Sequence, residues 1–359
     1  MNVTIDLALM SIVKVDELQE SVQLLTVVFV SWKDDRLVWN SSDYNNTKEI
    51  FLPVENVWHP EFFIHQPTHG NNRIGDIERQ LTHHYNSGLV KWNFVDTLTI
   101  SCSFDLTQFP WDVQTCDILF VVWGYQHEHI RLKINKDFII LDFYEENSAW
   151  SMKSTKAYVA PHPHKSKVGF QFVLQRRPDF FVMTIFLPII LLSVLSIFVF
   201  MIPIESGERI SFSFTILLTI VLFITLVSSY VPQSAESIPA MCFFLLFQCI
   251  QCVTACVGNI ISIKYYYKKG QPGKVWQKIT TVCGRKVCTK RKNVEPVHCD
   301  DQVSTVVTKE KQTVDMETEQ MKINWMDVSK ILDIVFAIIM IMFSLFCYSI
   351  FGYYLTNGQ

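Results

Sequence analysis

The stretch CSFDLTQFPWDVQTC, residues 102–116, begins and ends with cysteine and has thirteen residues between the two, including the apex Phe109-Pro110-Trp111-Asp112. Cys102 and Cys116 are the only two of the ten cysteines that lie before the apolar part of the chain. In an oxidising exterior they would form a disulfide, and the loop it closes would stabilise the fold by about 3 kcal/mol on the chain-entropy model. This loop therefore predicts an exported domain.

The sequence around the loop, residues 1–179, has the pattern of β structure. Short alternating runs are separated by turn signals, and Lys33-Asp34-Asp35 and Gly124-Tyr125 are expected to be turns. The runs expected to form strands are residues 3–7, 22–32, 98–104, 118–123, 130–134 and 168–174. Many short strands with no long amphipathic helix between them favour an antiparallel β-sandwich.

The rest of the chain is strongly apolar, and 49% of all residues are hydrophobic. Four charge-poor stretches reach the roughly 20 residues that a helix needs to cross a bilayer. They are residues 180–202, 210–231, 238–263 and 334–355. The sequence thus predicts a multidomain membrane protein, with a β-sandwich followed by a four-helix transmembrane bundle.

The charge distribution predicts the topology. Residues 264–292 hold ten Lys or Arg and no acid, and basic flanks favour the cytoplasmic side. Residues 1–179, the 228–237 loop and the C-terminus are then extracellular, whereas the 203–209 turn and residues 264–330 are cytoplasmic. Glycosylation sequons begin at Asn2, Asn40 and Asn45, all in the predicted exterior. No signal peptide is visible, and since an exported domain needs one, the chain is expected to be trimmed.

Four regions follow: residues 1–179, 180–263, 264–330 and 331–359. Within the third, residues 293–308 are expected to be a linker, and the acidic stretch 309–326 is compatible with a helix that continues into the last span. Four residues there could be imagined as a metal site, but their spacing fits no standard zinc pattern, which favours free thiols. They are Cys283, Cys288, His298 and Cys299.

The loop, the sandwich and the four apolar stretches together resemble the Cys-loop receptor family of nicotinic acetylcholine, serotonin type-three, GABA-A and glycine receptors. Other pieces follow in the family's order: Val15-Asp16-Glu17, Trp32-Lys33-Asp34-Asp35-Arg36-Leu37, Trp58-His59-Pro60-Glu61, Arg176-Arg177-Pro178 and Pro188. The resemblance implies a homo- or hetero-pentamer that lies in the plasma membrane, contacts lipids and, in many members, is postsynaptic. It also implies interface sites for a small-molecule agonist, amine-like in many members, and a central pore lined by the second helix.

The second apolar stretch supports a pore. Counting by three and four from Glu208 selects one helical face, with hydroxyls at both ends and leucines in the middle. The face consists of Glu208, Ser211, Thr215, Leu218, Leu222, Thr225 and Ser229. Hydroxyls can hydrate an ion, and leucine rings can gate by dewetting, so Leu218 is the expected gate. The alternative is that the hydroxyls simply bond to their own backbone.

Acidic residues at the inner end predict selectivity for monovalent cations. Five copies of Glu208, backed by Glu205, would form carboxylate rings that concentrate cations. The segment Pro203-Ile-Glu-Ser-Gly-Glu-Arg209 resembles the cation-selective branch of the family. An outer Ser229 in place of an acid leaves calcium permeability open, and pairing of Arg209 with Glu208 would cancel the ring.

The resemblance also implies an aromatic agonist box. Trp123 matches the box tryptophan, Tyr158 lies near a hairpin tyrosine, and His65 or Phe63 would face the site, while Trp58 is expected to be structural. Cation attraction to ring faces suits ammonium ligands. The complementary face is expected to contribute His83, Lys91 and Asn93.

Three departures from the family weaken that box. Val27 and Lys165 stand where aromatic residues are expected, and no adjacent cysteine pair is present near the hairpin. His162 and His164 at the hairpin tip could sense pH or bind a metal, although such residues are more often only polar loop positions.

Coupling between binding and gating is expected where the two regions meet, through Glu17, Trp111, Arg176 and Pro232. No catalytic pair, phosphate loop or complete metal motif is evident, so no enzyme, cofactor or nucleic-acid partner is expected. Two alternatives stay open: a modulatory subunit of a hetero-pentamer without a full agonist site, and a four-helix adhesion or scaffold protein.

Overall fold

The computed structural model describes residues 1–65, 74–75, 80–229, 238–276, 279–280 and 324–357. Several predictions fall outside these residues: Pro232, the 293–308 linker, and the residues Cys283, Cys288, His298 and Cys299. The chain divides into two compact units. The first comprises residues 1–187, 223–243 and 353–359, and the second comprises residues 188–222 and 244–352.

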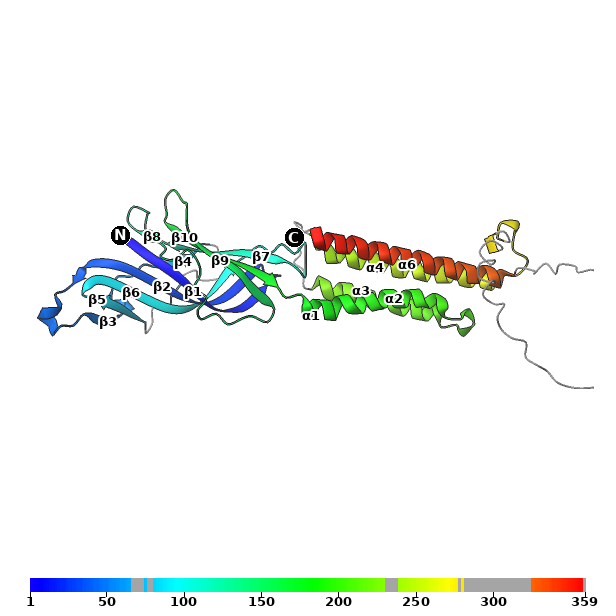
Figure 1. The fold of residues 1–359 in the computed structure, drawn as a ribbon, viewed down its shortest axis with the longest axis horizontal. Coiled ribbons are helices and arrows are strands. Elements are labelled where there is room, and N and C mark those ends of the chain that lie inside the picture. Colours follow the sequence, from blue (N-terminus) through cyan, green and yellow to red (C-terminus); the bar gives the residue numbers. More distant parts are fainter. Residues whose placement is uncertain (66–73, 76–79, 230–237, 277–278, 281–323, 358–359) are drawn as a thin grey trace, which may run out of the picture. The chain divides into compact units, whose positions relative to one another are not determined.

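The described residues of the first unit form ten strands in two sheets (Figure 1), which confirms the predicted sandwich. The strands are β1 (Asn2–Asp16), β2 (Ser21–Val38), β3 (Glu49–Pro53), β4 (Phe62–Ile64), β5 (Leu81–Tyr85), β6 (Ser87–Ser101), β7 (Val113–Val122), β8 (Arg131–Lys133), β9 (Trp150–Ala160) and β10 (Lys167–Arg176). A six-stranded sheet has the order β3-β5-β6-β2-β1-β8, and a four-stranded sheet has the order β4-β7-β10-β9. All pairs are antiparallel except β1 with β8.

The core lies between the sheets because alternate side chains of each strand point inward. In β10 every second residue is fully buried, as Val168, Phe170, Phe172 and Leu174 show. The intervening residues, beginning with Lys167, define what we call the outer face of the four-stranded sheet. The bond between Cys102 and Cys116 joins the end of β6 to β7 and confirms the predicted disulfide.

The expected turn at Lys33-Asp34-Asp35 is wrong, because β2 continues through these residues to Val38. Asp34 is buried, and its carboxylate accepts hydrogen bonds from Arg36 Nε at 2.9 Å and Nη2 at 2.7 Å. This side-chain pairing satisfies the carboxylate inside an irregular extended segment, where the sequence alone suggests a chain reversal.

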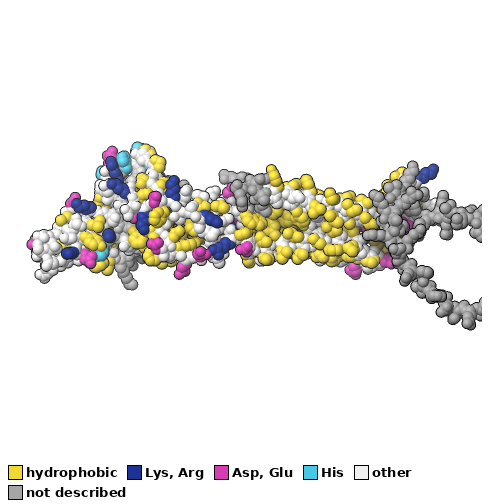
Figure 2. All heavy atoms as spheres, in the orientation of Figure 1, with side chains coloured by type: hydrophobic (Ala, Val, Ile, Leu, Met, Phe, Trp, Pro, Cys, Tyr) yellow, Lys and Arg dark blue, Asp and Glu magenta, His cyan; other side chains and the backbone are white. Residues whose placement is uncertain are grey.

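Four helical stretches among the described residues are long and apolar enough to cross a membrane: Asp179–Met201, Arg209–Ser228, Ala240–Tyr266 and Trp325–Tyr353. The first comprises α1 (Asp179–Phe181), a π-helical turn η3 (Val182–Phe186), α2 (Leu187–Phe198) and a short 3-10 turn. The others are α3 (Arg209–Ser228), α4 (Ala240–Tyr266) and α6 (Trp325–Asn357). Apolar side chains gather over these helices in Figure 2.

The π-helical turn lies directly before Pro188. Proline has no N–H, and its ring clashes with the carbonyl four residues earlier, so the helix widens locally. The Leu187 amide accordingly donates to the Val182 carbonyl, five residues back.

Polar side chains connect the helices inside the second unit. Asn259 of α4 donates to Ser213 of α3 at 2.6 Å, and Gln251 of α4 accepts from Ser344 of α6 at 3.0 Å. Such interhelical hydrogen bonds help helices associate in lipid, where apolar burial alone provides no driving force.

Candidate functional site

The outer face of the four-stranded sheet carries Trp123, directly after β7, with 58% of the residue exposed. The Nζ atom of Lys165 lies 3.3 Å from the centroid of its ring, well inside the range of a cation–π contact. The ring of Phe63 lies beside it, with a centroid separation of 6.3 Å. The structure therefore brings together Trp123, Phe63 and Lys165.

Lys167, which was not singled out from the sequence, lies next to this group. Its residue is only 7% exposed, and its Nζ lies 3.0 Å from Nε2 of His65. Lysine can only donate, so Nε2 must accept and His65 must be neutral. Burial, followed by the charges of Lys167 and Lys165, holds the pKa of His65 below its usual value of 6.5. The sequence signal was the spacing of two between Lys165, in the hairpin turn, and Lys167, the first residue of β10.

Tyr158 lies on the same outer face but does not join Trp123. It pairs with Gly169, where a Cβ would collide with the tyrosine ring, and its hydroxyl donates to Asp117 at 3.0 Å. Burial and this acceptor raise the pKa of Tyr158. Asp117 precedes Trp123 by six residues, about 20 Å along a strand. The hydroxyl is thus directed toward the other end of the face.

The exposed hairpin tip between β9 and β10 is ordered by His162. Its Nδ1 accepts hydrogen bonds from the backbone amides of His164 at 3.2 Å and Lys165 at 3.1 Å. The two imidazole rings are 6.4 Å apart. Within the described ranges no group of three or more His, Cys, Asp or Glu is placed to hold a metal ion.

The residues expected on the complementary face lie on the six-stranded sheet. His83 of β5 is the register partner of Lys91 in β6, and Asn93 follows two residues later on the same face. The ring of His83 stacks on Phe51 at 4.1 Å. Val27 lies on this face also, opposite Val95 of β6. The structure thus groups His83, Lys91 and Asn93 on one accessible surface.

Arg176 at the end of β10 is the centre of a buried charge network in the first unit. Its Nη1 donates to Glu17 at 2.7 Å, and its Nε donates to Asp112 at 2.7 Å. Arg176 and Asp112 are 4% and 1% exposed. The guanidinium also lies 4.2 Å from the ring centroid of Trp150. The structure brings together Glu17 and Arg176, as expected, and adds Asp112 and Trp150.

The Cys102–Cys116 loop contacts two helical segments of the same unit. Trp111 packs edge-on against Phe186 at 5.6 Å, and the Thr107 carbonyl accepts from the amide of Ala240 at 2.9 Å. Ala240 is the first residue of α4. The loop therefore touches both the first helical stretch and the start of the third.

The face proposed to line a pore is accessible along α3. Glu208, directly before the helix, and the remaining six members are all exposed in the isolated subunit, and Leu218 and Leu222 are 62% and 59% exposed. The opposite side of α3 is buried, at Ile216 and Ile220. The Thr215 hydroxyl donates to the Ser211 carbonyl at 2.9 Å, which uses its hydrogen and leaves the oxygen able to accept.

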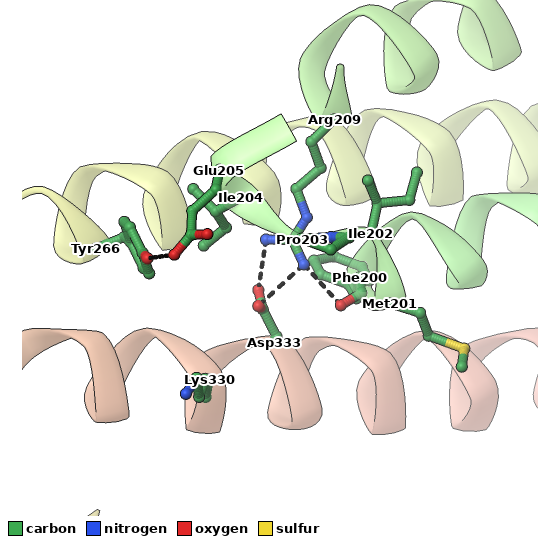
Figure 3. Close-up of a pocket in the computed structure, with 10 residues that line it drawn as sticks. All are labelled: Phe200, Met201, Ile202, Pro203, Ile204, Glu205, Arg209, Tyr266, Lys330 and Asp333. Atoms are coloured by element: carbon green, nitrogen blue, oxygen red, sulfur yellow. Dashed lines mark hydrogen bonds and ion pairs between the residues drawn. The ribbon is translucent and has the colours of Figure 1, made fainter. Parts of the chain in front are cut away.

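Arg209, the residue after Glu208, points toward Asp333 of α6 (Figure 3). It is 1% exposed, and its guanidinium pairs with Asp333 of α6 at 2.9 Å and donates to the carbonyls of Val199 at 3.1 Å and Phe200 at 2.6 Å. Arg209, Asp333 and Phe200 are among the residues that line a cavity of about 260 Å³. Asp333 was missed by sequence reasoning, although a lone acid at the edge of an apolar stretch is a signal of function.

The three sequon asparagines, Asn2, Asn40 and Asn45, are exposed on the sandwich. The Asn40 side chain accepts a hydrogen bond from the Ser42 hydroxyl at 2.8 Å and caps a short 3-10 turn. Glycosylation at these positions stays a prediction.

Comparisons with known proteins match two regions of the chain. Residues 1–178 match the family described as neurotransmitter-gated ion-channel ligand binding domain, and residues 185–296 match the neurotransmitter-gated ion-channel transmembrane region.

Curated relatives include three acetylcholine receptor subunits. Subunit beta-type acr-2 of Caenorhabditis elegans is 28% identical, over 75% of this chain and 47% of that protein. Subunit beta-like 1 of Drosophila melanogaster is 28% identical, over 73% and 51%. Neuronal subunit alpha-2 of Gallus gallus is 26% identical, over 73% and 50%. The chain spans about half the length of these relatives.

Proposed function

The chain belongs to the neurotransmitter-gated ion-channel family, and from that premise we propose that it is one subunit of a pentameric, agonist-gated cation channel. In this proposal the sandwich is extracellular, the four helices cross the plasma membrane, and five copies of α3 surround a central pore. Agonist binding between subunits shifts the equilibrium from closed to open by its differential affinity for the two states.

The observation that carries this proposal is the exposed face of α3. This face begins with the acid Glu208 and the hydroxyls of Ser211 and Thr215, which can hydrate a passing ion. The leucines that follow, Leu218 and Leu222, can form a dry constriction. A lipid-facing helix would have no use for an acid and a hydroxyl on that side.

Selectivity for cations rests on the separation of Glu208 from Arg209. Since Arg209 is held by Asp333 and two backbone carbonyls, it leaves the Glu208 carboxylate free to act on a passing ion. At about 8 Å and an effective dielectric near 20, one carboxylate attracts a monovalent cation by about 2 kcal/mol. Five such carboxylates favour cations strongly.

The test is the reversal potential of current through the chain expressed in oocytes, measured while external sodium chloride is diluted. The wild type should follow the sodium gradient, and Glu208→Ala should reduce that preference. Asp327→Asn is the matched control, because it removes an exposed acid near the start of α6, off the proposed pore face. A wild-type current that follows the chloride gradient would overturn the cation assignment.

Binding and gating are linked, in this proposal, through the Arg176 network and the Cys102–Cys116 loop. The loop contacts Phe186 and Ala240, so movement of the sandwich is transmitted to two helical segments. Trp123 and its neighbours are the proposed principal side of the agonist site, and His83, Lys91 and Asn93 are the proposed complementary side.

A second candidate is a modulatory subunit of a hetero-pentamer. The contact of Lys165 with Trp123 favours it, because the ring face that would attract an ammonium agonist already holds an internal cation. A chain that reaches the cell surface alone without agonist-evoked current, yet alters the current of a co-expressed cation-selective subunit, would support this alternative.

A further inference from the structure

The group formed by Trp123, Phe63, Lys165, Lys167 and His65, called here the Trp123 cluster, already contains one cation over the tryptophan ring. The Lys165 ammonium lies 3.3 Å from the ring centroid, which is where an ammonium ligand would gain most from the ring. A cationic ligand must displace Lys165 and then remain close to the displaced charge. Like charges at such separation repel, so the Trp123 cluster discriminates against ammonium groups.

A second cation lies at the start of β10. Lys167 follows Lys165 by two residues and is more than nine-tenths buried. Its ammonium carries three donors, and the described residues provide one acceptor, Nε2 of His65 at 3.0 Å. Buried charges are ordinarily paired, so an ammonium with donors left over is suited to an incoming anion.

No carboxylate of the described residues forms an ion pair with either lysine. Asp117, on the same outer face, instead accepts hydrogen bonds from Tyr158 at 3.0 Å and Gln171 at 3.3 Å. The positive charge of the two lysines is therefore not neutralised within the described part of the subunit. The lowered pKa of His65 is a second sign of this positive field.

We propose that the Trp123 cluster binds a small organic carboxylate, whose oxygens bridge the ammonium groups of Lys165 and Lys167 while its hydrocarbon part packs against Phe63. Charge-assisted hydrogen bonds from two ammonium groups to one carboxylate are strong and directional. The ligand class thus follows from the two lysines, and the apolar wall requires more than a bare inorganic anion. The inference rests on the proposed function only in identifying the Trp123 cluster as the agonist site.

The test compares butyrate with n-butylammonium, two probes of similar size and opposite charge. Binding is measured by ligand-observed NMR titration of the purified full chain in lipid nanodiscs, so no current is needed. The wild type should bind butyrate at least tenfold more tightly. Lys165→Met should weaken butyrate binding at least tenfold and strengthen n-butylammonium binding, because it removes the cation and frees the Trp123 face.

Two further variants make the result specific. Lys165→Arg keeps the charge and should keep the preference for butyrate. Lys156→Met removes an exposed lysine from β9, opposite Gln171, and should change neither affinity by more than twofold. A misfolded protein would lose both ligands, whereas the proposal requires the two affinities to move in opposite directions in Lys165→Met.

The inference fails if the wild type prefers n-butylammonium, or if Lys165→Met leaves both affinities unchanged or lowers both. Its failure can be told apart from failure of the channel proposal. Carboxylate binding with the expected dependence on Lys165, but without current alone or in co-expression, would overturn only the channel proposal. Current that is evoked by ammonium ligands and is unchanged in Lys165→Met would overturn only the inference that the site binds a carboxylate.

Discussion

Replacing Asp112 with asparagine tests whether the Arg176 network stabilises the end of the sandwich where β10 finishes. Asp112 accepts from Arg176 Nε at 2.7 Å, from Arg176 Nη2 at 3.2 Å and from Gln114 Nε2 at 2.6 Å. All three donors converge on one carboxylate that is 1% exposed. Asparagine keeps the shape but presents an NH2 group to at least one of these donors, and the Arg176 charge loses its closest partner.

The expected size of the effect follows from burial. Removing one partner of a buried ion pair costs about 3–5 kcal/mol, and Glu17 still accepts from Arg176 Nη1, so we expect the lower value for Asp112→Asn. About 3 kcal/mol is more than a hundredfold in a local opening equilibrium. Glu17 is 24% exposed and accepts one bond, so Glu17→Gln should cost only about 1 kcal/mol.

Hydrogen exchange of the full chain in nanodiscs measures this local stability. The Arg176 amide, which donates to the Asp112 carbonyl at 3.2 Å, should exchange more than a hundredfold faster in Asp112→Asn. Glu146→Gln is the matched control, because it breaks the exposed pair with neighbouring Arg177 and should have little effect. Equal exchange rates in Asp112→Asn and Glu146→Gln would refute the assignment.

Three further predictions concern the gate at Leu218, the protonation of His65 and the Cys102–Cys116 loop. Leu218→Thr should wet the constriction and increase spontaneous current, whereas Val221→Thr, exposed but off the pore face, should not; equal currents would contradict the gate. The pKa of His65 is lower in the folded protein than its usual value of 6.5, so the unfolded chain binds the proton at higher pH than the folded chain does. The free energy of unfolding therefore falls as pH drops below about 6.5 and through the folded pKa. His65→Gln should flatten that part of the dependence of apparent Tm on pH, and an unchanged slope would count against it. Cys116→Ser opens a fifteen-residue loop worth about 3 kcal/mol, and should abolish surface expression measured by biotinylation.

Most of the fold could be predicted because its strands and helices carry strong local patterns. The alternation of β10 and the uncharged length of α2 and α3 each follow from the residues alone. β9 was missed because its sequence, WSMKSTKAYVA, has a polar run in its middle and no regular alternation, as suits a strand at the edge of a sheet. The three-residue strand β4 is too short to carry any period.

The candidate site was harder to predict because it depends on which side chains meet. Lys165 was recognised as a departure from an aromatic box, but its contact with the Trp123 ring depends on how the hairpin folds over β7. Tyr158 lies on the expected face, yet the small Gly169 lets its ring lie flat toward Asp117. Asp333 and Arg209 are 124 residues apart in the chain, and only the folded bundle brings them together.

The same guanidinium determines how α3 can move. Arg209 is held by two carbonyls at the end of the first helical stretch and by a carboxylate on α6, so the inner end of α3 cannot shift without breaking several short bonds at once. A rigid helix that is fixed at one end can only tilt or rotate about that end. Displacement of α3 therefore grows with distance from Arg209, and a given angular change moves Leu222 further than Ser211. Arg209 is therefore the pivot of α3, and Asp333 makes α6 one of the elements that fix this pivot.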